Sequence, residues 1–111
     1  MTTPSLRAEM ESGAVWDDPS EDLLYDLLGD VERGDEQFMV VERTSDPSGQ
    51  TYLQAILGDS GGWILERRDG GPDAHYRASS AELRTVHAAV TAWAFELPDW
   101  ANAVFWQKTR V

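Results

Sequence analysis

Three aspartates recur at every fourth position early in the chain, at Asp22, Asp26 and Asp30. On a helix this spacing puts the three carboxylates in one row along the surface. Like charges at this spacing repel one another, and the C-terminal end of a helix, near Asp30, disfavours an anion. The row therefore lies where local helix stability does not favour it, which is typical of a surface that faces a cationic partner. The alternative interpretation is a general acidic bias of the chain.

The acidic charge of the whole chain is concentrated around this row. Residues 1–36 hold eleven of the twenty Asp and Glu residues and two of the nine basic residues, so they carry a net charge of −9. Residues 37–111 carry the remaining −2 of a total of −11. A segment with this charge repels nucleic acid and anionic membranes and attracts cationic surfaces. We therefore expect a basic protein as partner, and neither nucleic acid nor a membrane.

A second group of polar residues alternates with apolar residues along predicted strands. Pairing Leu57 with Trp63 across one turn, and Arg68 with His75 across the next, defines a trial register for three antiparallel strands. One face is then apolar and should lie under the helices; it carries Leu53, Ala55, Leu57, Trp63, Leu65, Tyr76 and Ala78. The opposite face carries Tyr52, Gln54, Ile56, Ile64, Glu66, Arg68, His75 and Arg77.

This register makes Gln54, Glu66 and Arg77 cross-strand neighbours, and three interpretations are open. An ordinary solvated face would hold a structural Glu66–Arg77 pair, which contributes about 0.2–1 kcal/mol. A polar and aromatic patch would instead bind a partner, with tyrosine and arginine as anchors. A concave pocket around these residues and His75 would bind a small ligand or catalyse a reaction. The residues predicted to bind a partner are Asp22, Asp26, Asp30, Tyr52, Gln54, Glu66, Arg68 and Arg77.

Residue types that would indicate catalysis or metal binding are sparse. The chain has no Cys, which excludes disulfides, thiol nucleophiles and thiolate metal ligands. Its two histidines, His75 and His87, are not at ligand spacing, and no acidic run matches a calcium loop. The paired glycines fall in predicted hairpin turns and do not open a helix, so no phosphate-binding loop is present. We expect no enzyme activity, no metal and no cofactor.

The first third of the chain predicts one strand and one helix. Residues 6–10 alternate between apolar and polar types, which is strand spacing. Asp18 and Glu21 flank Pro19 and Ser20 in a capping-box arrangement that predicts Asp18 as the helix N-cap. The apolar stripe of this helix is Leu23, Leu24, Leu27, Leu28 and Val31, and Gly34 is its predicted stop. Trp16 is predicted to act as a hydrophobic staple before the helix.

The rest of the chain predicts a meander, a second helix and a last strand. Strands are expected at 37–44, 51–57, 63–68 and 75–78, with turn residues between them. Ser79 and Glu82 predict a second capping box, and Pro98 is expected to end the helix. Its stripe is Leu83, Val86, Val90, Trp93, Ala94 and Leu97. Residues 103–108 are the last predicted strand, which Trp100 and Trp106 are expected to pack onto the helix; Trp63 and Trp93 are predicted core residues.

These elements predict an α+β fold in which a mainly antiparallel sheet is packed on one face by two helices. The sheet comprises the four-stranded central meander plus N-terminal and C-terminal strands. A length of 111 residues with 41% hydrophobic residues predicts one domain over 1–111, with residues 1–4 flexible. No apolar run approaches a membrane span, and the first residues do not resemble a secretory signal. We expect a cytoplasmic protein.

Four runs in the meander and one on the second helix carry a family resemblance. They are FMVVER at 38–43, GQTYLQA at 49–55, GWILERRDG at 62–70, HYRA at 75–78 and AWA at 92–94. Over roughly residues 36–106 the chain resembles small acidic proteins of high-GC actinomycete bacteria, some of which look like immunity proteins of polymorphic toxin systems. The resemblance implies an α+β fold, no catalysis and one cognate toxin domain as partner.

Together these patterns predict a non-catalytic acidic protein-binding domain, of which an immunity-type inhibitor of a basic toxin domain is the specific form. The alternative is a small-ligand-binding or enzymatic domain that uses the polar sheet face. A third prediction is a homodimer joined through a sheet edge or an exposed Trp. The identity of the partner does not follow from the sequence.

Overall fold

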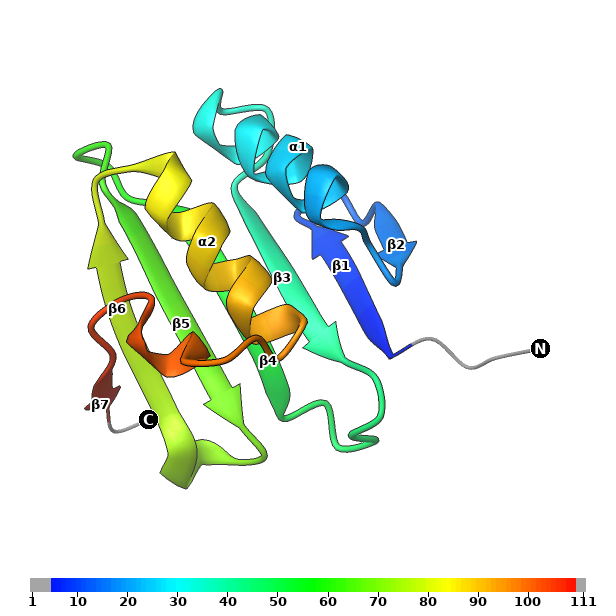
Figure 1. Cartoon of the computed structure of the whole chain (residues 1–111). Coiled ribbons are helices and arrows are strands. Elements are labelled where there is room, and N and C mark those ends of the chain that lie inside the picture. Colours follow the sequence, from blue (N-terminus) through cyan, green and yellow to red (C-terminus); the bar gives the residue numbers. More distant parts are fainter. Residues whose placement is uncertain (1–4, 110–111) are drawn as a thin grey trace.

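The computed structural model describes residues 5–109 of the chain, so the predicted flexibility of residues 1–4 lies outside the described residues. It contains a seven-stranded antiparallel sheet in the order β2-β1-β3-β4-β5-β6-β7, covered on one face by two helices (Figure 1). The strands are β1 (Leu6–Met10), β2 (Val15–Asp17), β3 (Phe38–Arg43), β4 (Thr51–Leu57), β5 (Trp63–Asp69), β6 (His75–Ser80) and β7 (Gln107–Thr109). The helices are α1 (Glu21–Glu32) and α2 (Leu83–Ala94), with short 3-10 turns at Pro72–Ala74 and Trp100–Asn102. The predicted α+β fold is confirmed, with seven strands.

The register of the central strands is the predicted one. Leu57 pairs with Trp63 between β4 and β5, and Arg68 pairs with His75 between β5 and β6. Because successive side chains of a strand point to opposite faces, these pairings place every other residue of β4, β5 and β6 under the helices. The apolar set predicted for that face does lie there, and Leu53, Ala55 and Leu65 are fully buried.

The start of α1 differs from the prediction. Ser20, not Asp18, is the N-cap, and its hydroxyl accepts a hydrogen bond from the backbone N–H of Leu23 at 3.1 Å. The Asp18 carboxylate is already engaged, because its Oδ1 accepts the backbone N–H groups of Ser5 and Leu6 at the start of β1. The predicted staple is also wrong, since Trp16 lies in β2, a three-residue strand that pairs with β1.

The C-terminal end of α1 follows the predicted glycine stop. Gly34 comes directly after the C-cap Arg33 and has a φ of 85°, which an L-residue with a side chain rarely adopts. The N–H of Gly34 donates to the carbonyl of Val31, and that of Asp35 donates to the carbonyl of Asp30. This Schellman arrangement satisfies the last carbonyls of the helix and turns the chain toward β3.

Helix α2 is shorter at both ends than predicted. Ser79 and Ser80 pair with Ile64 and Trp63 of β5, so they extend β6 and cannot form a capping box with Glu82, which is the N-cap. At the other end a Schellman arrangement closes after Ala94, with N–H groups of residues 96 and 97 donating to carbonyls of residues 93 and 92. Leu97 therefore lies outside the helix and is 44% exposed.

The predicted last strand at 103–108 is mostly wrong. Only Gln107–Thr109 forms a strand, which is β7, and the residues before it are irregular. Ala103, Val104 and Trp106 contact the hydrophobic core from this irregular segment, whereas Phe105 is 79% exposed. These three residues contact the core without forming a strand, because the segment crosses from the helix layer to the sheet edge.

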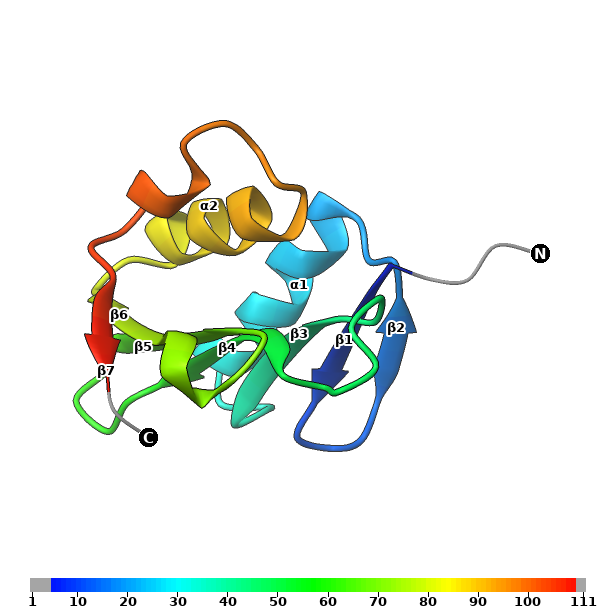
Figure 2. The ribbon, with the colours of Figure 1, turned by 90° about the horizontal axis from the view of Figure 1, so that it is seen from below.

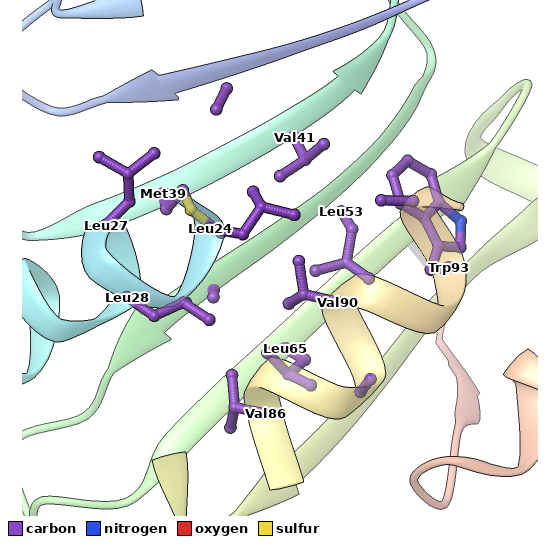
Figure 3. Close-up of a cluster of buried hydrophobic side chains, with 14 of the residues drawn as sticks. Leu24, Leu27, Leu28, Met39, Val41, Leu53, Leu65, Val86, Val90 and Trp93 are labelled. Carbon is purple, nitrogen blue, oxygen red and sulfur yellow. The ribbon is translucent and has the colours of Figure 1, made fainter. Parts of the chain in front are cut away.

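The hydrophobic core lies between the two helices and the covered face of the sheet (Figure 3). Leu53 of β4 lies near its centre, with Leu24 of α1 and Val90 of α2 in the same cluster. All three side chains have no exposed surface. Neither helix of the described part of the chain is long and apolar enough to cross a membrane.

We expect Leu53→Ala to lower the free energy of unfolding by about 2–5 kcal/mol, because it leaves a cavity under both helices. Urea unfolding followed by tryptophan fluorescence would measure the loss. Val15→Ala, at an exposed residue of β2, is the control and should change the free energy by less than about 0.5 kcal/mol. A loss below about 1 kcal/mol for Leu53→Ala would contradict the central position of this side chain.

The carboxylate of Asp46 organises the turn between β3 and β4. Its Oδ2 accepts the hydroxyl of Thr51 at 2.6 Å, and its Oδ1 accepts the hydroxyl and the backbone N–H of Ser48 at 2.7 and 2.9 Å. These hydrogen bonds, the one from Thr51 first, hold the pKa of Asp46 below its ordinary value of 3.8. The turn is therefore stabilised by the ionised form of this residue.

We expect Asp46→Asn to be less stable than the unaltered protein at neutral pH. A folded-state pKa below the unfolded-state value contributes stability above 3.8 that is lost as the pH falls through the folded-state pKa. The difference in the free energy of unfolding should therefore shrink on acidification, which urea titrations at a series of pH values would measure. A difference that stays constant from neutral pH to strong acid would contradict this role for the carboxylate.

Candidate partner-binding surfaces

The outward face of α1 carries the predicted row of aspartates, and the three carboxylates differ in whether they form an ion pair. Arg33 forms ion pairs with Asp30 and with Asp35, so the carboxylate at the C-terminal end of the row already has a cationic partner within the chain. Asp22 and Asp26 are exposed, and neither has an ion-pair partner among residues 5–109. The two free carboxylates, rather than all three, are therefore available to a cation outside the chain.

An exposed aromatic side chain lies between these two carboxylates in the sequence. Tyr25 is 48% exposed, and its ring meets the ring of His87 edge-on at a centroid distance of 5.1 Å. His87 belongs to α2, and its Nε2 lies 3.0 Å from the carbonyl oxygen of Glu21. These contacts hold α1 against α2, so Tyr25 is a partly fixed aromatic residue with Asp22 and Asp26 beside it.

The second predicted surface is the sheet face that no helix covers, here called the open face. On β4 and β5, Tyr52 pairs with Arg68, and the Arg68 guanidinium lies 5.9 Å from the centre of the tyrosine ring. The same guanidinium donates to the side-chain oxygen of Gln50 at 2.7 Å and to Nδ1 of His75 at 3.1 Å. Arg68 is therefore held in place by contacts within the face.

His75 is a packed member of the open face and not the wall of a pocket. It is 3% exposed, with the ring of Tyr52 6.4 Å away. Because a guanidinium has only donors, the Arg68 contact makes Nδ1 the acceptor and puts the proton of a neutral ring on Nε2. That nitrogen lies 3.7 Å from the Glu66 carboxylate, so His75 is a close polar neighbour of Glu66. Glu66 and Arg77 are nevertheless direct cross-strand partners, as predicted.

The eight predicted partner-binding residues fall on two opposite sides of the molecule. Asp22, Asp26 and Asp30 belong to α1 in the helix layer, whereas the other five belong to strands and point away from the helices. Figure 2 shows both helices on one side of the sheet, with the open face on the other side. One flat partner surface cannot contact both groups at once, so each must be judged as a separate surface.

A cavity of about 380 Å³ lies beside β6, at the edge of the sheet. It is lined by Arg77, Ala78, Ser79, Phe105 and Gln107. Arg77 is the one member of the hypothesised small-ligand pocket that reaches it, since Gln54, Glu66 and His75 do not line it. The cavity therefore does not assemble the group of polar residues that a catalytic pocket on this face would need.

Arg67 is a site residue that the sequence interpretation missed. It lies on the covered face, 6% exposed, and forms an ion pair with Asp69. Three aromatic rings surround its guanidinium, with centroids 4.0 Å away for Tyr76, 4.8 Å for Trp100 and 4.9 Å for Trp106. The trial register already put residue 67 on the same face as Trp63, so alternation along β5 is the signal that could have found it.

A second arginine, Arg43, packs its guanidinium against an aromatic ring at the C-terminal end of α2. The Arg43 guanidinium lies 4.5 Å from the centre of the Trp93 indole, and its Nη2 donates to the carbonyl of Trp93 at 2.9 Å. The two arginines lie on the covered face of β3 and β5, so each ties a strand to the helix layer. Both cations are used inside the protein and are not available to an anionic partner.

Neither a metal site nor a similar known protein indicates what these surfaces bind. Within residues 5–109, no group of three or more His, Asp and Glu side chains is placed to hold a metal ion. Comparison with known proteins found no matching family model, no similar curated protein and no similar solved structure. The function of the two surfaces therefore has to be inferred from their own geometry and charge.

We expect Arg67→Lys to lower the free energy of unfolding by about 1–3 kcal/mol, because the ammonium group of lysine lacks the planar guanidinium that packs against the three rings. Chemical unfolding would measure the loss, and near-UV circular dichroism would report the changed environment of the tryptophans. Arg84→Lys, at an exposed position of α2, is the matched control and should have a negligible effect. Equal losses for the two variants would show that the aromatic contacts of Arg67 contribute nothing to stability.

Proposed function

We propose that this chain is a non-catalytic acidic domain that binds a basic protein partner through the outward face of α1. The observation that carries the proposal is the pair of exposed carboxylates of Asp22 and Asp26, which have no ion-pair partner within residues 5–109, beside the exposed ring of Tyr25. Aromatic residues are common anchors of protein interfaces, and carboxylates around such an anchor select a cationic partner. The excess of negative charge in residues 1–36 supports the same assignment.

The position of the carboxylates gives this surface a role in the rate of association. An acidic patch steers a basic partner toward it during diffusion, and the effect weakens as salt screens the charges. Glu21 and Asp22 lie in the first turn of α1, where the helix dipole favours them, but Asp26 does not share that benefit. Its carboxylate is thus better accounted for by an external cation than by helix stability.

The specific form that we propose is an immunity-type inhibitor, acting in the cytoplasm on a basic toxin domain. The resemblance of the meander to small acidic actinomycete proteins supports this form, because some of them look like immunity proteins. The charge supports it as well, since an acidic inhibitor complements the cationic surface that a nucleic-acid-cleaving toxin uses for its substrate. Inhibition by occlusion requires no catalytic residue in the inhibitor.

The small-ligand or enzymatic alternative has less support. It requires a pocket around Gln54, Glu66, His75 and Arg77, and His75 is buried among Tyr52 and Arg68 instead. No observation favours it over a binding surface.

We expect the double variant Asp22→Lys and Asp26→Lys to lower the association rate of the partner by about tenfold or more at low salt. The partner would first be isolated by affinity capture from the native cell lysate at low salt and identified by mass spectrometry. Association of the purified partner would then be measured by biolayer interferometry over a series of salt concentrations. For the inhibitor form, the enzymatic activity of that partner should fall when the unaltered protein is added.

The matched control is Asp59→Lys with Asp73→Lys, which makes the same change of net charge at exposed residues away from α1. It should retain most of the association rate, because local charge on α1 and not total charge directs the partner. Full binding by the α1 variant, or an equal loss in the control, would contradict α1 as the interface. Thermal unfolding by circular dichroism should show that both variants remain folded.

A further inference from the structure

The open face is ordered into three rows that run across the strands. The first row contains Phe38, Ile56 and Ile64, which are direct cross-strand partners on β3, β4 and β5. The second row contains Glu9, Val40, Gln54, Glu66 and Arg77, from β1 through β6. The third row contains Arg7, Glu42, Tyr52, Arg68 and His75 over the same strands. An apolar row is thus flanked on one side by two rows that contain charges.

The open face carries little net charge. Its acidic residues are Glu9, Asp17, Glu42 and Glu66, and its basic residues are Arg7, Arg68 and Arg77. With His75 neutral, these four acidic and three basic residues give a net charge of −1. A face with this small charge and an apolar row can approach a second copy of itself without strong repulsion.

The charges of the open face are unevenly distributed across it. On one side of β4 lie Asp17, Glu9 and Glu42 with Arg7, a net charge of −2. On the other side lie Arg68 and Arg77 with Glu66, a net charge of +1. The central strand β4 contributes uncharged side chains, namely Tyr52, Gln54 and Ile56. At the acidic side, Arg7 is already paired with Asp17 at 3.1 Å, so it does not offset the two glutamates.

We propose that the open face binds a second copy of this chain, with a two-fold axis that runs along β4 between the two sheets. This axis places β3 over β5 of the second copy and β1 over β6 of the second copy, and it keeps each row over the same row. Glu42 then faces Arg68 of the second copy, and Glu9 faces Arg77 of the second copy. Each contact occurs twice, as the symmetry of an isologous dimer requires. The separated charges of one face therefore complement those of the other.

The strand on the axis, β4, contributes only uncharged side chains to the same arrangement, and Glu66 faces Val40 of the second copy beside it. Phe38 faces Ile64 of the second copy, and Ile56 faces Ile56 of the second copy across the axis. The Gln54 side chains also meet on the axis, where each amide can donate to the other because an amide has both donors and an acceptor. Two antiparallel sheets commonly pack face to face in this aligned manner, about 10 Å apart. Half-buried apolar side chains of the open face would thereby leave water.

The acidic helices do not prevent this dimer. Helix α1 lies on the opposite side of the sheet, so the two α1 helices point outward from a face-to-face pair (Figure 2). With layers about 10 Å apart, the two helices are separated by roughly 30 Å, whereas the Debye length is about 8 Å at physiological salt. The outward faces of α1 stay free, so dimerisation and the proposed partner binding use separate surfaces.

The interface is small, and we expect a dimer that dissociates in the micromolar range. Five strands about 4.8 Å apart and three rows about 7 Å apart give a footprint at the low end of specific interfaces. Sedimentation equilibrium in physiological salt, from low to high micromolar concentration, should show a reversible monomer–dimer equilibrium. A protein that stays monomeric over the whole range would overturn the proposal and leave the open face to a different occupant.

Two variants test the apolar row. Ile56→Asp should shift the equilibrium to the monomer, because it places two like charges together on the two-fold axis. Leu97→Asp makes the same chemical change at an exposed residue of the helix layer and should leave the dimer unchanged. Unaltered dimerisation of the Ile56 variant, or loss of the dimer in the Leu97 control, would overturn the assignment of the face. Circular dichroism would verify that each variant is folded.

A charge exchange tests the two-fold axis itself, using two exposed residues. Glu9→Arg and Arg77→Glu should each weaken the dimer by about tenfold, because each puts like charges face to face twice. The double variant restores opposite charges with reversed polarity and should recover the dissociation constant to within about threefold of the unaltered protein. A double variant as weak as either single variant would overturn this pairing of the two faces.

Discussion

The contact of α1 and α2 with one face of the sheet is the interaction on which the rest of this structure depends. Leu53 on β4, Leu24 on α1 and Val90 on α2 have no exposed surface, and their burial places apolar area of both layers out of water. Because side chains alternate along a strand, covering one face dictates which residues appear on the other. The ordered rows of the open face are therefore a consequence of the same register that builds the core.

Two arginines extend the contact between the helix layer and the sheet beyond the apolar core. Burial of a guanidinium is unfavourable unless its charge is compensated, and Arg67 has the carboxylate of Asp69 and three aromatic rings around it, although its Nε donates no hydrogen bond within the described residues. Trp100 and Trp106 come from the irregular segment after α2, so Arg67 ties that segment to β5 and compensates for its lack of regular structure. Arg43 does the same between β3 and the end of α2 through Trp93.

The two layers thus separate two kinds of surface. The helix layer presents the carboxylates of Asp22 and Asp26 beside Tyr25, which suit a cationic protein. Their negative charge attracts such a protein before contact and so raises its association rate. The open face has a small net charge, with an acidic excess on one side of the uncharged strand β4 and a basic excess on the other, which suits close contact with a surface of matching pattern. Because the sheet lies between them, one surface can be occupied without blocking the other (Figure 2). A dimer formed through the open face would present two acidic helices pointing away from each other.

The fold class, the meander and its register could be predicted from the sequence, because alternation and turn residues are local signals and they place Leu57 opposite Trp63. Predictions from local signals were wrong where a residue could form either of two different hydrogen-bonding arrangements. Ser79 could cap a helix but pairs with β5, and Asp18 could cap α1 but binds the N–H groups that open β1. These two cases were resolved by the packing of the folded chain, as were the three-residue β2, the burial of His75 and the placement of the aspartates and the polar strand residues on opposite sides. The physical reason is that each depends on contacts between segments far apart in the chain, whose free energy exceeds the preferences of a few neighbouring residues.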